Sequence, residues 1–287
     1  MKYQFMDLHG SGFEVKKMVQ VLGVHRSGYY GYQKHKTSPR AKENETLVEL
    51  IRQVWKKSRK LYGSPRITAE IRSQGYRYGE NRVARLMKEE GVRSQSRKAF
   101  RVTTRSAGDQ PVVKDLVQRK FETDGPGKIW ISDITYVWTR EGWLYLAAVL
   151  DIYNREIVGW SLQDRLHQDL VISALNQALW RHPAEKDLIF HSDRGGQYRS
   201  RKIQRILSLR GVRPSQGSRG DCFDNAMAES FFSTFKCELI HLERFATKAE
   251  AHLKIYDFIE IYYNRERRHS ALNYQTPIEY ANAAIQP

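Results

Sequence analysis

The sequence predicts an all-α region followed by an α/β domain, and two observations lead to this division. The first is charge, because residues 1–123 carry 27 Lys and Arg against 12 Asp and Glu, whereas residues 124–287 carry 21 against 20. The second is periodicity, because apolar residues recur at helical spacing in the first part and alternate as in strands from residue 129. The basic excess indicates that the helical part binds a polyanion; a ribosome-like or membrane-surface basic arm is the alternative.

Two helix-turn-helix candidates make up the helical part. Residues 1–40 hold the first, in which a short amphipathic helix and a glycine-containing turn precede a second helix. Residues 41–105 hold the second, a helical DNA-binding region in which Gly75 separates two further helices. Residues 106–127 are expected to form a polar linker with a short helix around Val113–Lys120.

Arginines supply the candidate contacts to DNA phosphates, because a protein that neutralises phosphates binds duplex DNA without needing its sequence. Some belong to the second helical region and others to a late basic cluster that also includes Arg267 and His269. The residues expected to contact DNA are Arg66, Arg82, Arg85, Arg265 and Arg268. Ordinary solvated helix faces and helix ends would have the same appearance in the sequence.

From residue 128 the pattern predicts strands and helices in the order β-β-β-α-β-α-β-α. The first three strands, at 129–138, 143–151 and 156–162, are joined by short turns and must form an antiparallel meander. A helix and a short buried strand at 188–191 follow, and then two more helices separated by a brief strand. Three tryptophans of the strands are expected in the core: Trp138, Trp143 and Trp160.

Three acids are candidates for a metal site. Asp133 lies inside the first strand, Asp193 follows the short buried strand, and Glu229 lies on a later helix. A carboxylate within an apolar strand is costly unless a cation compensates it, and Mg²⁺ prefers oxygen ligands. Carboxylates from different elements can hold two such ions about 4 Å apart. For any single acid, a salt bridge or a solvated position is the alternative reading.

The spacing of these residues adds to the hypothesis. Asp193 and Glu229 are separated by 35 intervening residues, and Lys236 stands seven positions after Glu229, which is two helical turns and therefore the same helix face as Glu229. His191 shares the strand face of Asp193, but a packed, hydrogen-bonded histidine is the favoured reading. Asp151 is open to two readings, as a neighbour of the acids or as a turn cap.

The words around these acids carry a family resemblance. They are His-Ser-Asp-Arg-Gly-Gly-Gln-Tyr, Asp-Asn-Ala-Met-Ala-Glu-Ser-Phe-Phe and Tyr-Asn-Arg-Glu-Arg-Arg-His-Ser-Ala-Leu. With the 35-residue spacing, they resemble the DDE signature of retroviral integrases and, more closely, the second-frame (OrfB-type) transposases of the IS-three group of bacterial insertion sequences. The resemblance covers essentially the whole chain. It implies an RNase H-like, retroviral-integrase-type catalytic core with C-terminal helices over residues 128–287.

The resemblance also implies a function. Asp133, Asp193 and Glu229 would be the catalytic, metal-binding triad, with two Mg²⁺ ions or Mn²⁺ as a substitute, and Lys236 would contact DNA. The reaction would be cleavage and strand transfer of double-stranded DNA at insertion-sequence ends and target sites. The partners would be a second copy of the chain on DNA and an upstream-frame (OrfA-type) product, since no sustained heptad repeat occurs here.

Two other functions fit part of the pattern. An RNase H-like nuclease would use the same acids, although the paired helix-turn-helix candidates and Lys236 argue against it. A non-catalytic, transposase-derived DNA-binding regulator would need no three convergent carboxylates. The two cysteines, the absence of an apolar run of about 18 residues and the lack of a signal-peptide layout favour a cytoplasmic bacterial protein, associated with the nucleoid when it is bound to DNA.

Overall fold

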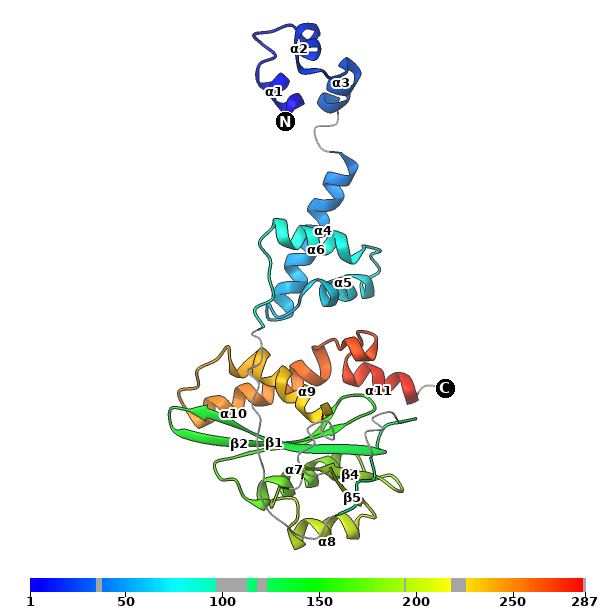
Figure 1. The fold of residues 1–287 in the computed structure, drawn as a ribbon, viewed down its shortest axis with the longest axis vertical. Helices are drawn as coiled ribbons and strands as arrows, with labels where there is room; N and C mark the ends of the chain where they lie inside the picture. The colour runs from blue at the N-terminus through cyan, green and yellow to red at the C-terminus, as the bar shows by residue number, and fades with distance from the viewer. Residues whose placement is uncertain (35–37, 97–112, 118–122, 194, 218–225, 286–287) are drawn as a thin grey trace.

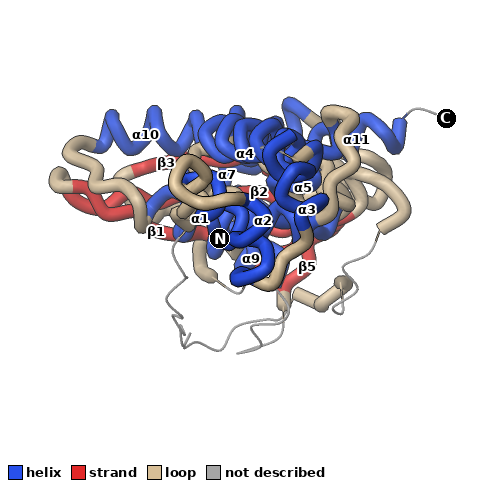
Figure 2. The backbone as a smooth tube through the Cα atoms, turned by 90° about the horizontal axis from the view of Figure 1, so that it is seen from above, coloured by secondary structure: helices blue, strands red, loops and turns tan. Residues whose placement is uncertain are grey.

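The computed structural model describes residues 1–34, 38–96, 113–117, 123–193, 195–217 and 226–285. An N-terminal helical unit, a second helical unit and an α/β core follow one another along its long axis (Figure 1). Seen from above, the helical units lie over the core (Figure 2). The structure therefore has the all-α region followed by an α/β domain that the sequence predicts.

The N-terminal unit has a small core. Its helices are α1 (Lys2–Leu8), α2 (Val15–Leu22) and α3 (Arg26–Lys34). They pack around Met6, Met18 and Tyr29, and α2 ends at Gly23, whose φ of 60° is a left-handed conformation that glycine adopts without strain. Tyr29 is therefore a core residue, whereas Tyr30 is exposed.

The second helical unit has a larger core. Its helices are α4 (Pro39–Lys57), α5 (Ser64–Ser73) and α6 (Glu80–Glu89). The Ser38 side chain caps α4 by accepting a hydrogen bond from the backbone N–H of Ala41, so α4 begins at Pro39 and runs across the boundary expected after residue 40. The buried residues of this unit are Leu47, Ile51, Val54, Tyr62, Ile67, Ile71, Val83, Leu86, Met87 and Val92.

This second unit is docked on the α/β core. Leu61 belongs to the apolar cluster of the core itself. Arg59 pairs with Asp257, and the Tyr62 hydroxyl donates a hydrogen bond to the backbone carbonyl of Glu266 at 3.0 Å. These contacts hold the two units together, which the sequence did not predict.

The core is built on one five-stranded sheet, in the order β3-β2-β1-β4-β5. Its strands are β1 (Ile129–Thr139), β2 (Gly142–Asp151), β3 (Ile157–Gln163), β4 (Ile189–Ser192) and β5 (Arg213–Gln216). β1, β2 and β3 form the expected antiparallel meander, whereas β4 pairs in parallel with β1 and with β5. This mixed sheet with its intervening helices is the RNase H-like fold that the resemblance implied.

Helices cover both faces of the sheet. The helices are α7 (Gln168–Arg181), α8 (Arg201–Leu209), α9 (Ala226–Phe235), η2 (Lys236–Ile240), α10 (Lys248–Tyr256), η3 (Asp257–Glu266), η4 (Ser270–Leu272) and α11 (Pro277–Ile285), of which η2 and η3 are π-helical and η4 is a 3₁₀ helix. α7 and α8 share one apolar cluster with the sheet, and α9 to η3 share the other (Figure 1).

The approach of α7 to the sheet depends on Gly159 of β3. A Cβ atom built there would lie 2.3 Å from the carbonyl oxygen of Ala174 and 2.7 Å from the backbone nitrogen of Ala178. Neither backbone atom can move aside without shifting α7. Glycine is therefore needed at this position for the close contact between helix and strand.

Two expectations about the core region were wrong. Trp160 is buried as expected, but Trp138 and Trp143 are 56% and 45% exposed. Both lie near the β1–β2 turn, where their rings contact each other, and the alternation of the strand could not show where the covering helices end. The helix expected around Val113–Lys120 is absent from residues 113–117, and residues 118–120 lie outside the described part of the chain.

Candidate active site and its surroundings

Two acids lie side by side on neighbouring parallel strands of the sheet, Asp133 inside β1 and Asp193 directly after β4. β1 and β4 are in register up to the pair Ser132 and Ser192, and Asp133 and Asp193 are the next residues of the two strands. Neighbouring strands lie about 4.8 Å apart, so the two carboxylates start from adjacent backbone positions. The sheet topology thus brings together two acids that are 60 residues apart in the sequence.

The third acid, Glu229, and Lys236 both influence the pKa of Asp133. Glu229 is exposed on the first turn of α9, which packs against β1. The pKa of Asp133 is raised from 3.8 to about 7, first by burial and then by the carboxylates of Asp193 and Glu229, while the backbone N–H of Ile134 and the ammonium of Lys236 oppose the shift. Asp193, Glu229 and Lys236 therefore all lie within electrostatic reach of Asp133.

The donor set suits a divalent cation. It consists of carboxylate oxygens from three elements, which are the ligands that Mg²⁺ and Mn²⁺ prefer, and a cation would relieve the repulsion that raises the pKa of Asp133. Within the described residues, no three His, Cys, Asp or Glu side chains are already grouped as a metal site. The carboxylate chemistry of the three acids suits a divalent cation. To bind one, the carboxylates would have to move closer together, and the exposed side chain of Glu229 is free to change its rotamer.

Two further residues lie next to the acids. Gly195 donates its backbone N–H to Asp193 Oδ1 at 2.9 Å, and a Cβ atom at Gly195 would lie 2.9 Å from the same oxygen. Tyr198 is buried beside the acids, and its hydroxyl hydrogen-bonds to the Ser132 hydroxyl at 3.1 Å. Burial and the charges of Asp133 and Asp193 raise the pKa of Tyr198. Tyr198 is the last residue of the motif His-Ser-Asp-Arg-Gly-Gly-Gln-Tyr, and this position was the signal in the sequence that pointed to it.

Comparison with known proteins decides the family. An HTH-like domain model matches residues 42–100, and two integrase core domain models match residues 123–222 and 210–277. The transposase InsF for insertion sequence IS3A of Escherichia coli (strain K12) is 38% identical over 284 residues, which cover 98% of this chain and 99% of that protein. The chain belongs to the IS3 family of transposases.

One further relative and two solved structures are also similar to this chain. The insertion element IS600 uncharacterized 31 kDa protein of Shigella sonnei is 40% identical over 263 residues, covering 92% of this chain and 97% of that protein. The HTLV-2 integrase catalytic core domain in complex with magnesium (dimeric form) is similar with a TM-score of 0.39 and 15% identity, covering 55% of this chain and 98% of that chain. A chain of the simian T-cell lymphotropic virus intasome has a TM-score of 0.45 and 13% identity, covering 82% and 75%.

Lys236 of this IS3-family transposase lies where the α-helical pattern stops. α9 ends at Phe235, and the π-helix η2 begins at Lys236, so the seven-residue spacing from Glu229 is not continued as regular α-helix. The Lys236 ammonium lies 5.9 Å from the ring centroid of Tyr136 on β1 and lowers the pKa of Asp133. It therefore lies within electrostatic reach of Asp133, and its contact with DNA remains a prediction.

Two of the expected DNA-contact arginines have partners across the interface between the second helical unit and the core. Arg66 Nη1 lies 3.0 Å from Glu238 Oε1. Arg268 pairs with Glu70 and donates a hydrogen bond from Nη2 to the Ser73 hydroxyl at 2.9 Å. In the free transposase these two side chains therefore hold the interface.

The other three arginines differ in exposure. Arg82 donates hydrogen bonds to the side chains of Asn44 and Glu43 within the second helical unit. Arg85 is exposed and pairs with Glu89 one turn further along α6, and Arg265 is exposed and donates its Nε–H to the carbonyl oxygen of Glu260. Arg85 and Arg265 are thus accessible to a polyanion.

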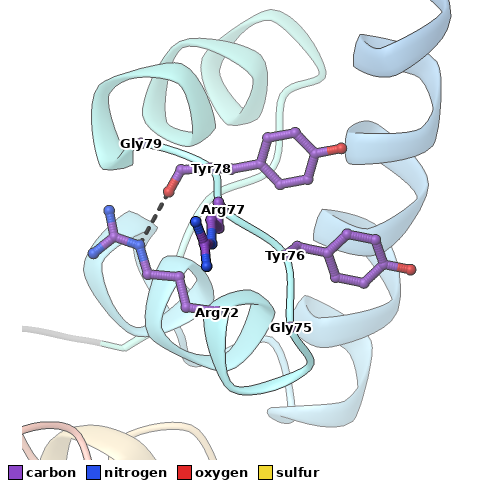
Figure 3. A pocket seen from close by; sticks show the side chains of 6 residues that line it. All are labelled: Arg72, Gly75, Tyr76, Arg77, Tyr78 and Gly79. Atoms are coloured by element: carbon purple, nitrogen blue, oxygen red, sulfur yellow. Dashed lines mark hydrogen bonds between the residues drawn. The ribbon is translucent and has the colours of Figure 1, made fainter.

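The turn between α5 and α6 is a further basic surface of the second helical unit. An open pocket there is lined by Arg72, Gly75, Tyr76, Arg77, Tyr78 and Gly79 (Figure 3). Arg72 Nε donates to the Tyr78 carbonyl at 3.0 Å, which fixes the turn, and the rings of Tyr76 and Tyr78 are stacked with centroids 6.0 Å apart. Two arginines therefore stand on a turn that its own hydrogen bond and rings hold in shape.

A buried ion cluster, absent from the sequence predictions, centres on Glu238. Arg267 binds both carboxylate oxygens, with Nε–Oε2 and Nη2–Oε1 distances of 2.8 and 2.9 Å, and Arg66 and the Tyr262 hydroxyl bind the same carboxylate. Burial raises the pKa of Glu238, but Arg267 and Arg66 outweigh it, and the pKa lies below its ordinary value. No sequence pattern marks an acid on η2 as the partner of arginines from α5 and from the segment after η3.

The open questions about His191 and Asp151 have structural answers. His191 is buried, and its Nδ1 lies 2.9 Å from the Ser215 hydroxyl, which agrees with a packed, hydrogen-bonded histidine. Asp151 accepts hydrogen bonds from the backbone N–H groups of Gly127 and Tyr153 and from the Trp130 indole. It therefore caps the turn after β2.

None of the helices in the described ranges is both long and apolar enough to cross a membrane.

Proposed function

We propose that this transposase cleaves and joins DNA strands at insertion-sequence ends and that Asp133, Asp193 and Glu229 hold Mg²⁺ for this reaction. The observation that supports it is the convergence of acids from β1, β4 and α9, whose charges together raise the pKa of Asp133. A bound pair of Mg²⁺ ions supplies the activation of a water or 3′-hydroxyl and the stabilisation of the leaving 3′-oxygen. Mn²⁺, with similar oxygen ligands, would substitute.

The chain's own residues have distinct parts in this proposal. Gly195 orients the Asp193 carboxylate, and Lys236 binds a phosphate of the DNA end next to the acids. The basic helical units bind the duplex of the terminal repeat, and a second copy on DNA and an OrfA-type product complete the assembly. No covalent protein–DNA intermediate is needed.

The test is strand chemistry on a labelled duplex carrying the insertion-sequence end, with Mg²⁺ and with or without the upstream-frame product. Wild type should nick and join the strand; nicking alone indicates a nuclease, and binding alone indicates a regulator. Asp193→Ala should lose cleavage and joining by several orders of magnitude and retain DNA binding, because only the carboxylate at the reacting centre is removed. The exposed Asp164→Ala is the matched control. Full activity in Asp193→Ala would exclude the triad.

Lys236 provides a second test of the site. Lys236→Ala should lower the joining rate about 10- to 100-fold, because a charge-assisted contact to the DNA phosphate is lost. Lys236→Arg should retain much of the rate if the contact is to phosphate and less if it is to a base edge. Lys202→Ala removes the positive charge of an exposed lysine on α8 and is the control for the loss of charge. If Lys236→Ala joined DNA at the wild-type rate at physiological salt, Lys236 would be an ordinary solvated side chain with no contact to the DNA end.

A further inference from the structure

A cavity lined by arginines adjoins the Glu238 cluster. A cavity of about 180 Å³ opens between α5, α9, the β2–β3 turn and the segment after η3. Liquid water takes about 30 Å³ per molecule, so the cavity has room for a small polyatomic ion and its water. The polar side chains that line it are those of Arg66, Arg155, Arg267, His269, Ser230, Thr234 and Ser270.

The charges around this cavity do not balance. Arg66 and Arg267 share one carboxylate, that of Glu238. Arg155 is half-buried, and among the described residues no carboxylate lies within ion-pair distance of its guanidinium. Three guanidinium groups therefore face the cavity against one negative charge, and no acidic side chain lines it. Such a buried excess is unfavourable unless an anion compensates it.

The same three arginines act on His269. It is buried, and its pKa is lowered to about 2 by burial and then by the charges of Arg267, Arg66 and Arg155. Its ring is therefore neutral and accepts from Arg267 Nη1, with N–N distances of 3.3 to 3.4 Å. Because the histidine is neutral, the positive potential in the cavity comes from the arginines alone and is available to an anionic ligand.

The backbone of Arg155 points to a role for its side chain. Its φ is 63°, a left-handed conformation that a long side chain adopts uncommonly and that Asn or Gly adopts readily. The residue occupies the β2–β3 turn, where its N–H bonds to the carbonyl of Asp151. Turn formation alone would be served as well by Asn, so the guanidinium is the feature that the turn itself does not require.

We propose that this cavity binds a phosphate group through the guanidinium of Arg155, with the hydroxyls of Ser230 and Thr234 as further donors, and that in the DNA complex this group is a backbone phosphate. Ser230 follows Glu229 directly on α9, so the phosphate site and Glu229 share one helical turn. Arg66 brings the second helical unit to the same ligand, so a strand bound here would contact both units. Only the identity of the carrier, DNA, rests on the proposed function.

Phosphate binding is tested on the full-length chain by thermal unfolding in inorganic phosphate against chloride at equal ionic strength. A ligand that binds the folded state raises the melting temperature, whereas the general salting effect of phosphate is the same for all variants. Arg155→Asn, which suits the left-handed backbone, should weaken the apparent phosphate affinity at least about tenfold. Ser230→Ala should weaken it less, and Arg205→Gln on exposed α8 should leave it unchanged. Equal phosphate responses of wild type, Arg155→Asn and Ser230→Ala would overturn the site.

The carrier is tested by the affinity for a short duplex end over a range of salt, without Mg²⁺ and in an Asp193→Ala background. Loss of one phosphate contact should lower the salt slope by about one in Arg155→Asn, which a merely structural role would not do. A phosphate response with an unchanged slope would exclude DNA as the carrier. If wild type neither cleaves nor joins DNA while both effects persist, the proposed function fails and the phosphate site stands. If strand chemistry proceeds and Arg155→Asn changes neither measurement, the site alone fails.

Discussion

Two acid clusters of the same core have opposite electrostatics. The pKa of Asp133 is raised to about 7 because burial and two further carboxylates act on it, opposed by the backbone N–H of Ile134 and by a single cation, Lys236. The pKa of Glu238 is lowered although Glu238 is also buried, because Arg267 and Arg66 contact it directly. Burial is common to both, so the supply of cations by the chain makes the difference.

The comparison separates an acid that serves the fold from the acids for which we propose a bound cation. Glu238 receives hydrogen bonds from three side chains on three elements and joins the second helical unit to the core. Asp133 inside β1 and Asp193 directly after β4 lack a comparable set of donors and repel one another. Such frustration is unfavourable for the fold and is typical of sites whose remaining partner comes from solution.

The largest effect should come from removing the charge of Glu238. Glu238→Gln leaves Arg66 and Arg267 buried without their common counter-charge, and we expect the free energy of unfolding to fall by about 3–5 kcal/mol. Chemical denaturation measures it. Glu243→Gln, which breaks the exposed pair with Lys254, is the control and should cost about 0–1 kcal/mol. Similar losses in the two variants would show that the buried cluster is no more important than a surface pair.

The acid cluster should respond to Mg²⁺ instead. At a Mg²⁺ concentration about 100 times the dissociation constant, binding to the folded state adds about 2.7 kcal/mol to the free energy of unfolding. Asp193→Asn should abolish this gain, whereas Glu238→Gln, if folded, should keep it. Titration of the melting temperature with MgCl₂, against NaCl at equal ionic strength, gives the measurement. A gain that persists in Asp193→Asn would place the cation elsewhere.

The smallest effect concerns pH at the Glu238 cluster. His269 has a pKa of about 2 in the folded chain and about 6.5 when unfolded, so below pH 6.5 the unfolded state binds a proton that the folded state does not. Its contribution is present above pH 6.5 and is lost as the pH falls. Glu238, whose pKa lies below 4.5, titrates only at lower pH.

At pH 5.5 the loss from His269 should therefore be about 1.4 kcal/mol relative to pH 7.5. Denaturation at the two pH values measures it, and His269→Gln should show a correspondingly flatter response than wild type. The exposed His252→Gln serves as the control. An equally steep response in wild type and His269→Gln would mean that the histidine is not buried as a neutral group.

The fold and the position of the acids were predictable because they follow from local patterns. The meander is a consequence of short turns between alternating strands, and the two aspartates could be picked out because Asp133 stands inside an apolar strand and Asp193 directly after one. The parallel register that makes Ser132 the neighbour of Ser192 was not in the sequence pattern. Strand pairing between distant segments is selected by packing of the whole sheet, and periodicity gives only the face on which a side chain lies.

The sequence by itself determined the order of helices and strands, the basic helical half and the candidate metal-binding acids, since these depend on spacing, charge and local motifs. Only the tertiary structure decided what the arginines do. Arg66 and Arg268 hold the second helical unit on the core, whereas Arg155, which no pattern marked, faces a cavity without an acid of its own. An arginine has the same local sequence signal in each role, because its function depends on whether the fold brings a carboxylate within reach, and that is set by contacts across more than a hundred residues of chain.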